Sequence, residues 1–400
     1  MTNEGNANLT RRETLRTWLT AGGVVLAGFH GLRLPAFCVD VKENAFRGGR
    51  YLGPIEFLGE GHIPMDTLMD DGLDGRLYTD LSSVSPDHPV IPTKTFFVRT
   101  RASTLLDEHK PWRIKAGGLL NQTVEIGIAD LRKMAKPAGL HLMECSGNVR
   151  LGHFGMLGVA DWRGAPVSEL LDSLKVDKAA SHVLISGFDR YPSASFTSVP
   201  GASWIFTMDD LRSSHAFFAT EMNGSDLIKD HGAPVRLVVP GWYGCAWVKW
   251  VDEITFLREG AATTAQMREF AHRTMQQGVP ELVQDYRPVI IEQAAMPVRV
   301  EKWVVDGKIR YRVYGIAWGG VRQVSALGIR FSSELDSRDD FVPLDHFEQT
   351  TNDPWTFWTH AWTATAPGQY FIQLRVKDAS IPARRLNAGY YVRSVEIIEI

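Results

Sequence analysis

Residues 230–250 read DHGAPVRLVVPGWYGCAWVKW and hold the densest grouping of charged, aromatic and turn-forming residues in the chain. The apolar run at 235–239, the Pro-Gly turn after it and the run that begins at 248 predict two short strands joined by a tight turn. His231, Arg236 and Lys249 are set five and then thirteen residues apart across this unit. Arginine suits a bidentate grip on phosphate and lysine a point contact, so the three side chains are candidates for binding one anionic group. Separately, each is more often a surface charge or a structural histidine.

The sequence around this stretch predicts a mixed α+β region from residue 51 to about residue 257. Short helices are expected at 167–174 and 209–219 from their apolar spacing. No GxGxxG or GxxxxGK[ST] motif occurs, so a nucleotide-binding fold has no support. The expected strands, separated by glycine and proline, are 95–98, 182–186, 235–239 and 248–255.

The C-terminal part predicts a second, all-β region. Residues 260–285 are polar with a helical start and are interpreted as a linker. The turn spacing beyond residue 287 is typical of a β-sandwich of about 100 residues. Its expected strands are 293–303, 309–317, 326–332, 368–376 and 389–400.

The N-terminal residues 1–45 are interpreted as an export leader. Arg11 and Arg12 precede an uncharged stretch, residues 18–29, that is shorter than the ~20 continuous apolar residues of a membrane span. This pattern fits the twin-arginine signal, which exports folded proteins and therefore suits a protein that takes up its cofactor before export. It predicts a periplasmic protein without stable membrane insertion. An amphipathic first helix with two surface arginines is the alternative.

Composition excludes several classes of protein. The 400 residues hold 43 Lys and Arg against 46 Asp and Glu, a net charge of −3, so a nucleic-acid partner is not expected. Three cysteines are too few for a disulfide framework or a CxxC-type zinc site. The 12 tryptophans indicate a core and pockets lined by large flat rings.

Cys145 is the cysteine with the most suggestive surroundings. It follows an apolar strand-like run, residues 141–143, and is followed by Gly147 and Arg150, a setting that favours a thiolate. Such a thiolate can bind a soft, high-valent metal. It can also act in acyl transfer, which needs a histidine base such as His153 or His231. A small buried apolar residue is the third interpretation.

Arg99, Arg101 and Arg113 flank the apolar residues 96–98. Alternating arginines of this kind usually form a solvated face. The functional alternative is a pocket for an oxyanion.

Several motifs in order resemble the sulfite oxidase family of molybdopterin enzymes. Residues 145–150 resemble that family's Cys-Ala-Gly-Asn-Arg-Arg motif, and residues 161–166 resemble its Trp-x-Gly-x-Pro element. Residues 187–189 match the position of an aspartate that contacts the pterin. The most specific match joins residues 221–224 to residues 230–250. The resemblance implies a cofactor-binding α+β domain over 46–284 and an immunoglobulin-like dimerisation domain over 285–400.

The resemblance also implies the chemistry and the residues of the site. Molybdenum with molybdopterin would oxidise sulfite or a related small sulfur oxyanion with oxygen from water, and Cys145 would bind the metal. The catalytic positions implied are Cys145, Arg99, Arg150 and Trp162. The cofactor-binding positions implied are Phe97, Val98, Arg99, Thr100, Arg101, Cys145, Asp189, His231, Arg236, Trp247, Val248 and Lys249.

The chain departs from the family pattern at several positions. Thr100 and Arg101 replace an asparagine and a histidine, and Val149 replaces an arginine. No tyrosine stands in residues 270–280, where the family has its active-site tyrosine, and the last pocket arginine should fall near residues 384–385.

Because no haem motif precedes the domain, the expected electron acceptor is a separate protein such as a c-type cytochrome. A sulfane dehydrogenase subunit that acts on carrier-bound sulfur is one alternative. A catalytically silent structural partner of the same fold is another.

Overall fold

The computed structural model describes residues 46–69, 74–101, 106–107, 109–189, 202–271, 288–320, 326–335, 338–347 and 354–400. The expected leader, residues 1–45, and residues 272–280, where the family has its tyrosine, lie outside the described residues. The predicted domain boundary near residue 284 also lies outside them and stays a prediction. Among the described residues, no helix combines the length and apolar character needed to cross a bilayer.

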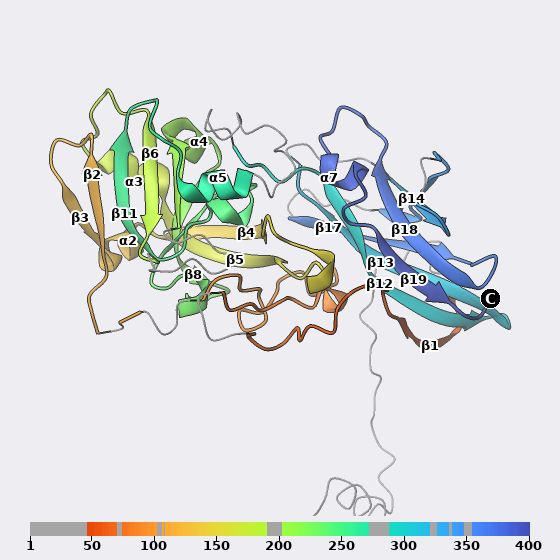
Figure 1. Cartoon of the computed structure of the whole chain (residues 1–400). Coiled ribbons are helices and arrows are strands. Elements are labelled where there is room, and N and C mark those ends of the chain that lie inside the picture. The colour runs from red at the N-terminus through yellow and green to blue at the C-terminus, as the bar shows by residue number, and fades with distance from the viewer. Residues whose placement is uncertain are drawn as a thin grey trace, which may run out of the picture. The chain divides into compact units, whose positions relative to one another are not determined.

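The first region contains one antiparallel sheet and one mixed sheet, in which β11 pairs parallel with β2, and short helices lie beside them (Figure 1). One sheet has the order β10-β8-β5-β4, with β9 paired to β8, and the other has the order β3-β2-β11-β6-β7. The strands are β2 (Arg113–Gly118), β3 (Val124–Gly127), β4 (Lys136–Glu144), β5 (Leu157–Pro166), β6 (His182–Gly187), β7 (Ser203–Thr207), β8 (Phe217–Met222), β9 (Ser225–Asp226), β10 (Arg236–Val238) and β11 (Val251–Leu257). The helices are α2 (Ile128–Met134), α3 (Val167–Ser173), α4 (Met208–Ser213) and α5 (Ala265–Ala271).

Local sequence explains where two of these helices begin. In α3, Val167, Leu170 and Leu171 are buried at the spacing of one helix face. In α4, the hydroxyl of Thr207 accepts a hydrogen bond from the Asp210 N–H at 3.0 Å and so caps the helix N-terminus. Both helices therefore start close to the predicted positions.

Two expected elements differ from the structure. Residues 95–98 do not form a strand. The chain turns at residues 93–95, where the N–H groups of Thr95 and Phe96 both bond to the carbonyl of Pro92, and Val98 forms only an isolated bridge with Leu77. The predicted helix at 209–219 ends at Ser213, because residues 216–220 are buried and continue into β8. When every residue of a segment is buried, its apolar residues show neither the period of a helix nor that of a strand, so the sequence pattern cannot tell the two apart.

The C-terminal region contains two antiparallel sheets, in agreement with the predicted strand-rich pattern. Their orders are β1-β12-β13-β17-β16 and β15-β14-β18-β19, and β12 contacts β18 between the sheets. The immunoglobulin-like character of this region stays a prediction. The strands are β1 (Arg50–Ile55), β12 (Ala294–Val305), β13 (Lys308–Trp318), β14 (Leu327–Ser332), β15 (Val342–Pro343), β16 (His346–Phe347), β17 (Trp355–Trp362), β18 (Gly368–Val376) and β19 (Arg393–Ile397), with the short helix α7 (Arg384–Asn387) before β19.

Sequence patterning did not find β1 or β17. β1 lies far from its partner in the sequence and pairs antiparallel with β12, so the N-terminal part of the described chain completes a C-terminal sheet. β17 contains three tryptophans and supplies Trp355 and Trp358 to the core.

We predict that Gly315→Ala destabilises the C-terminal region. Gly315 pairs with Trp358 across β13 and β17, and a Cβ at residue 315 would lie 2.0 Å from the Trp358 ring and 2.4 Å from the Met296 carbonyl oxygen. Overpacking of this kind costs about 1–3 kcal/mol of unfolding free energy. Urea unfolding measures the change. Gly117→Ala is the control, because its Cβ would meet only the Thr123 hydroxyl at 3.8 Å; equal stability of the two variants would contradict the prediction.

Candidate functional site

Cys145 stands directly after β4, at the strand-to-loop junction that the sequence indicates. The Cys145 carbonyl accepts the Asn148 N–H at 3.0 Å, which closes a tight turn, and the Asn148 side chain accepts the Met156 N–H at 3.0 Å. The Gly147 N–H points at the Cys145 sulfur at 3.4 Å. A backbone donor so placed stabilises a thiolate, the form of cysteine that binds metals.

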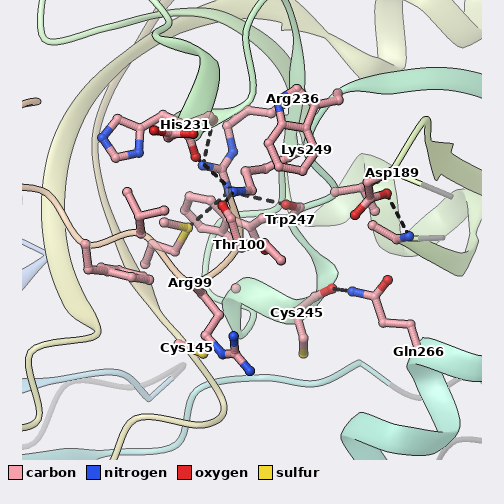
Figure 2. A pocket seen from close by; sticks show the side chains of 18 of the residues that line it. Arg99, Thr100, Cys145, Asp189, His231, Arg236, Cys245, Trp247, Lys249 and Gln266 are labelled. Carbon is pink, nitrogen blue, oxygen red and sulfur yellow. Dashed lines mark hydrogen bonds between the residues drawn. The ribbon is translucent and has the colours of Figure 1, made fainter. Parts of the chain in front are cut away.

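A single pocket collects most of the predicted site residues. Eleven of the twelve predicted cofactor-binding residues line it, all except Arg101. Figure 2 shows His231, Arg236 and Lys249 grouped together, with Arg99 and Cys145 on the opposite side of the pocket in this view. The pocket therefore brings together segments that lie before β2, after β4, after β6 and around β10 and β11. The predicted roles of these residues remain predictions.

Arg236 is a buried cation whose side chain is held by backbone and aromatic groups. Its two terminal nitrogens donate to the carbonyls of His231 and Trp247, at 3.1 and 3.2 Å. Its guanidinium lies 5.5 Å from the Trp162 ring centroid and 5.8 Å from that of Trp247. Burial lowers the Arg236 pKa to about 9, and its Nε atom has no hydrogen-bond partner among the described residues.

Lys249 is the second cation of the pocket. Its ammonium donates to the Asp230 carbonyl at 2.8 Å and to the Thr100 carbonyl, and lies 4.2 Å from the Trp250 ring centroid. Burial, and then repulsion by Arg236, lower the Lys249 pKa to about 7. Without a ligand, the pocket thus disfavours the charged forms of Arg236 and Lys249, and a bound anion would stabilise both.

His231 enters the site as a neutral hydrogen-bonding group rather than as a cation. It is 2% exposed, and burial lowers its pKa to about 3. Its Nε2 donates to the Thr93 carbonyl at 2.9 Å, which places the proton on that nitrogen in the neutral ring. Asp189 is also buried, and its carboxylate accepts the Ala202 N–H at 2.9 Å.

The four predicted catalytic residues have different surroundings. Cys145 and Arg99 line the pocket, and Arg99 forms an ion pair with Asp74. Trp162 is buried and its ring lies against the Arg236 guanidinium. Arg150 lies in the short 3-10 helix Arg150–Gly152; burial, and to a smaller extent the charge of Arg150, lowers the pKa of Arg393. Neither Trp162 nor Arg150 is among the pocket-lining residues.

Arg101 and Arg113 do not join Arg99 in the lining of the pocket. Arg101 lies 3.7 Å from the Asp230 carboxylate, so it contacts the pocket through that residue. Arg113 is exposed on β2. The three arginines thus do not form one oxyanion pocket.

Sequence reasoning missed several residues that line the pocket. Asp230, Gly244, Cys245 and Trp250 belong to the 230–250 stretch, where only the cations and Trp247 with Val248 were assigned to the cofactor. Gln266 and Phe270 come from α5, in the segment interpreted as a linker. The Gln266 amide donates to the Cys245 carbonyl at 2.8 Å and its oxygen accepts the Ser203 N–H at 2.6 Å. The helical start of the linker was the only sequence signal for them.

The donor set fits a metal that arrives with ligands of its own. Among the described residues there is no group of three or more His, Cys, Asp or Glu side chains able to hold a metal ion. One soft sulfur ligand, Cys145, faces the same pocket as Arg236 and Lys249. These residues fit a molybdenum cofactor, whose pterin brings sulfur ligands and an anionic tail.

Comparison with known proteins agrees with this geometry. Residues 102–264 match the family model for the oxidoreductase molybdopterin binding domain. The chain is 25% identical to the mitochondrial sulfite oxidase of Macaca fascicularis over 326 residues, 76% of this chain and 57% of that protein. It is 30% identical to an NADPH nitrate reductase of Mycosarcoma maydis over 194 residues, 41% of this chain and 19% of that protein.

The chain is therefore similar to the sulfite oxidase family of molybdopterin oxidoreductases, and residues 102–264 match the molybdopterin binding domain. In fold, the chain is similar to the sulfane dehydrogenase SoxCD of Paracoccus pantotrophus, with a TM-score of 0.61 and 17% identity over 94% of this chain and 96% of that chain. The matched domain and the similar proteins imply molybdenum with molybdopterin as the cofactor. The chain covers little more than half of the sulfite oxidases it matches and about a fifth of the nitrate reductase.

We predict that Lys249 makes the stability of the cofactor-free protein depend on pH. Between pH 7 and 10.5, Lys249 is protonated in the unfolded chain and has lost its proton in the folded protein. In this range the free energy of unfolding therefore increases as the pH rises. The Lys249→Met variant should lose this increase, which urea unfolding at pH 7 and pH 9 will measure. Lys175→Met, at an exposed lysine, is the control. Equal pH slopes for wild type and Lys249→Met would contradict the assignment.

Proposed function

We propose that this chain oxidises sulfite or a related small sulfur oxyanion at a molybdenum centre and passes the electrons to a separate acceptor such as a c-type cytochrome. One observation carries the proposal: a soft sulfur ligand, the buried cation Arg236, the half-buried cation Lys249 and Arg99 line the same pocket. The sulfur ligand suits the metal, Arg236 and Lys249 suit the anionic pterin tail, and Arg99 suits an anionic substrate.

The protein's own groups divide the work at this site. When bound, the molybdenum cofactor supplies oxygen-atom transfer and takes up two electrons. Cys145 holds the metal as a thiolate, supported by the Gly147 N–H. Arg236 and Lys249 bind the pterin tail, while Trp162 and Trp247 pack around Arg236 and keep water from it. Arg99, oriented by Asp74, attracts the substrate anion.

The test is metal analysis combined with a steady-state substrate screen. Protein from a cofactor-competent host should contain stoichiometric molybdenum and should reduce cytochrome c or an artificial acceptor with sulfite. Thiosulfate and organic sulfoxides complete the screen. Absence of molybdenum would overturn the oxidoreductase proposal and favour the silent structural partner.

Cys145→Ser should abolish turnover while the circular dichroism spectrum stays that of the wild type. A hydroxyl is a poor ligand for a soft metal, and serine is close to cysteine in size. Turnover at the wild-type rate by Cys145→Ser would refute the role of Cys145 as metal ligand.

We predict that Arg99→Ala raises the KM for sulfite about 10- to 100-fold, because a hydrogen bond between charged groups contributes about 1.5–3 kcal/mol. Arg113→Ala is the matched control, because this arginine is exposed on β2 and does not line the pocket. An unchanged KM in Arg99→Ala would place the substrate anion elsewhere.

Oxidation of sulfur bound to a carrier protein is the second candidate, and one surface feature favours it. Val149 and Leu151, close to the Cys145 loop, are 40% and 64% exposed. Exposed apolar side chains beside a site suit a protein-borne substrate better than a small anion. Turnover of a carrier-bound persulfide without turnover of sulfite would select this candidate.

We also propose export by the twin-arginine route to the periplasm and a homodimer formed through the C-terminal region. The Arg11-Arg12 pair supports the first proposal, and the resemblance of the C-terminal strand pattern to the family's dimerisation domain supports the second. N-terminal sequencing of a periplasmic fraction tests the first, and mass measurement in solution tests the second.

A further inference from the structure

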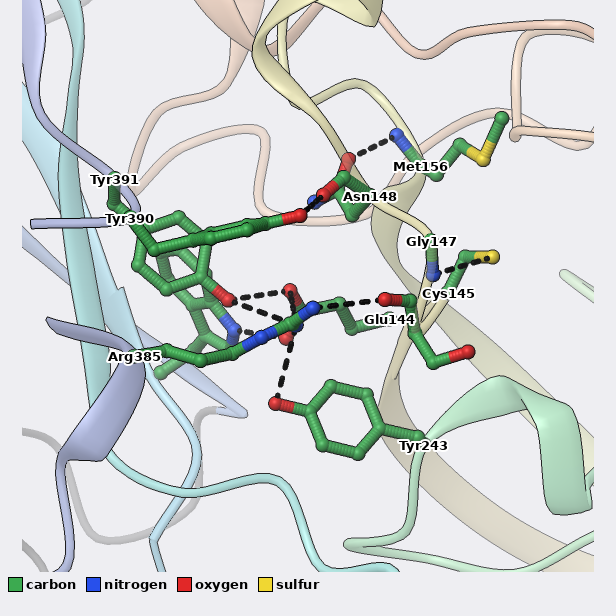
Figure 3. A network of polar contacts seen from close by, with 11 residues as sticks. Glu144, Cys145, Gly147, Asn148, Met156, Tyr243, Arg385, Tyr390 and Tyr391 are labelled. Carbon is green, nitrogen blue, oxygen red and sulfur yellow. Dashed lines mark hydrogen bonds and ion pairs between the residues drawn. The ribbon is translucent and has the colours of Figure 1, made fainter. Parts of the chain in front are cut away.

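Side chains from the C-terminal region converge on the loop that carries Cys145 (Figure 3). Three of them contact the carboxylate of Glu144, the residue just before Cys145. The Trp318 indole N–H donates to it at 2.9 Å and the Tyr391 hydroxyl at 2.7 Å. The Arg385 guanidinium lies 3.7 Å from the same carboxylate. The described chain thus places a cation and two donors around one acid.

The same region also contacts the loop after Cys145. Arg385 donates through its second terminal nitrogen to the Ser146 carbonyl at 2.8 Å, and Tyr390 donates through its hydroxyl to the Asn148 carbonyl. The Arg385 guanidinium lies 4.4 Å from the Tyr390 ring centroid, which holds these two side chains together. Arg385 is therefore bound to both chain neighbours of Cys145.

Burial makes this arrangement sensitive to the loss of any partner. Glu144 is 0% exposed and Arg385 is 5% exposed. A buried carboxylate is unfavourable unless it is paired and hydrogen-bonded, and apolar side chains in place of a buried ion pair are often as stable or more so. Stability alone therefore does not explain a buried ion pair beside Cys145, whereas fixing the geometry of the loop does.

We propose that Glu144 and Arg385 are positioning residues that fix the Cys145 thiolate in the pocket, so that the C-terminal region forms part of the active site. The Arg385 guanidinium contacts the residues on either side of Cys145. These contacts fix the position of the thiolate relative to Arg236 and Lys249. The proposal rests on the proposed molybdenum function. The resemblance had suggested an arginine near residues 384–385 in the substrate pocket, but Arg385 does not line the pocket and its terminal nitrogens contact Glu144 and Ser146.

The first test uses the full chain without cofactor, so it does not depend on turnover. Iodoacetamide labels the thiols, and peptide mass spectrometry gives the rates at Cys145 and Cys245 separately. Cys245 lines the same pocket but belongs to the Gly244–Ala246 turn, so it serves as an internal reference. Glu144→Gln and Arg385→Gln should raise the Cys145-to-Cys245 rate ratio at least tenfold. Arg384→Gln, next in the helix and paired with Glu292, should leave the ratio unchanged.

The second test uses the holoenzyme. At wild-type molybdenum content, Glu144→Gln should shift the g-values of the Mo(V) electron paramagnetic resonance signal, which a purely structural role would not move. Arg385→Lys should also differ from the wild-type signal. A single ammonium cannot reach both Glu144 and Ser146 as the guanidinium does. Arg384→Gln should show the wild-type signal.

These outcomes separate the two proposals. Wild-type labelling ratios and wild-type g-values in folded Glu144→Gln would overturn the positioning role. Equal acceleration of labelling at both cysteines would show general unfolding and would also count against the positioning role. The labelling test is then repeated with Tyr391→Phe, a milder change that removes one hydrogen bond to Glu144. A wild-type protein without molybdenum would overturn the proposed function, while the labelling ratio would still decide whether Glu144 and Arg385 position Cys145.

Discussion

The repulsion between two enclosed cations, Arg236 and Lys249, is the constraint on which the site depends. Arg236 and Lys249 repel each other in a pocket where burial already disfavours both charges. The chain holds them with backbone carbonyls and with the faces of Trp162, Trp247 and Trp250, and the carboxylates of Asp189 and Asp230 offset the disadvantage of the Lys249 charge only in part. An anionic ligand would stabilise both charges, so this arrangement suits ligand binding better than the stability of the protein alone.

The tryptophans serve two purposes that composition does not distinguish. Trp162 and Trp247 pack edge to face, with 6.0 Å between their centroids, and together enclose Arg236. Trp355 and Trp358 instead fill the core of the C-terminal sheets, where Gly315 leaves room for the Trp358 ring. Rings near the cofactor cations thus support binding, and rings in β17 support packing.

The C-terminal region is joined to the catalytic region by chemistry as well as by packing. Its buried donors end on a carboxylate and two carbonyls of the loop that carries Cys145, and β1 from the N-terminal side completes one of its sheets. The C-terminal region therefore contributes contacts to the loop that lines the pocket.

The sequence by itself determined the fold class and named eleven of the residues that line the pocket. Cys145, His231, Arg236 and Lys249 lie in short motifs whose spacing is set by local turns, and local turns are readable from sequence. Only the tertiary structure decided the charge of His231, the separate place of Arg113, and the entry of Gln266 and Phe270 into the pocket. It alone joined Glu144 to Arg385, which lie 241 positions apart in the chain. Burial and long-range contacts set these properties, and neither has a local signature in the residues themselves.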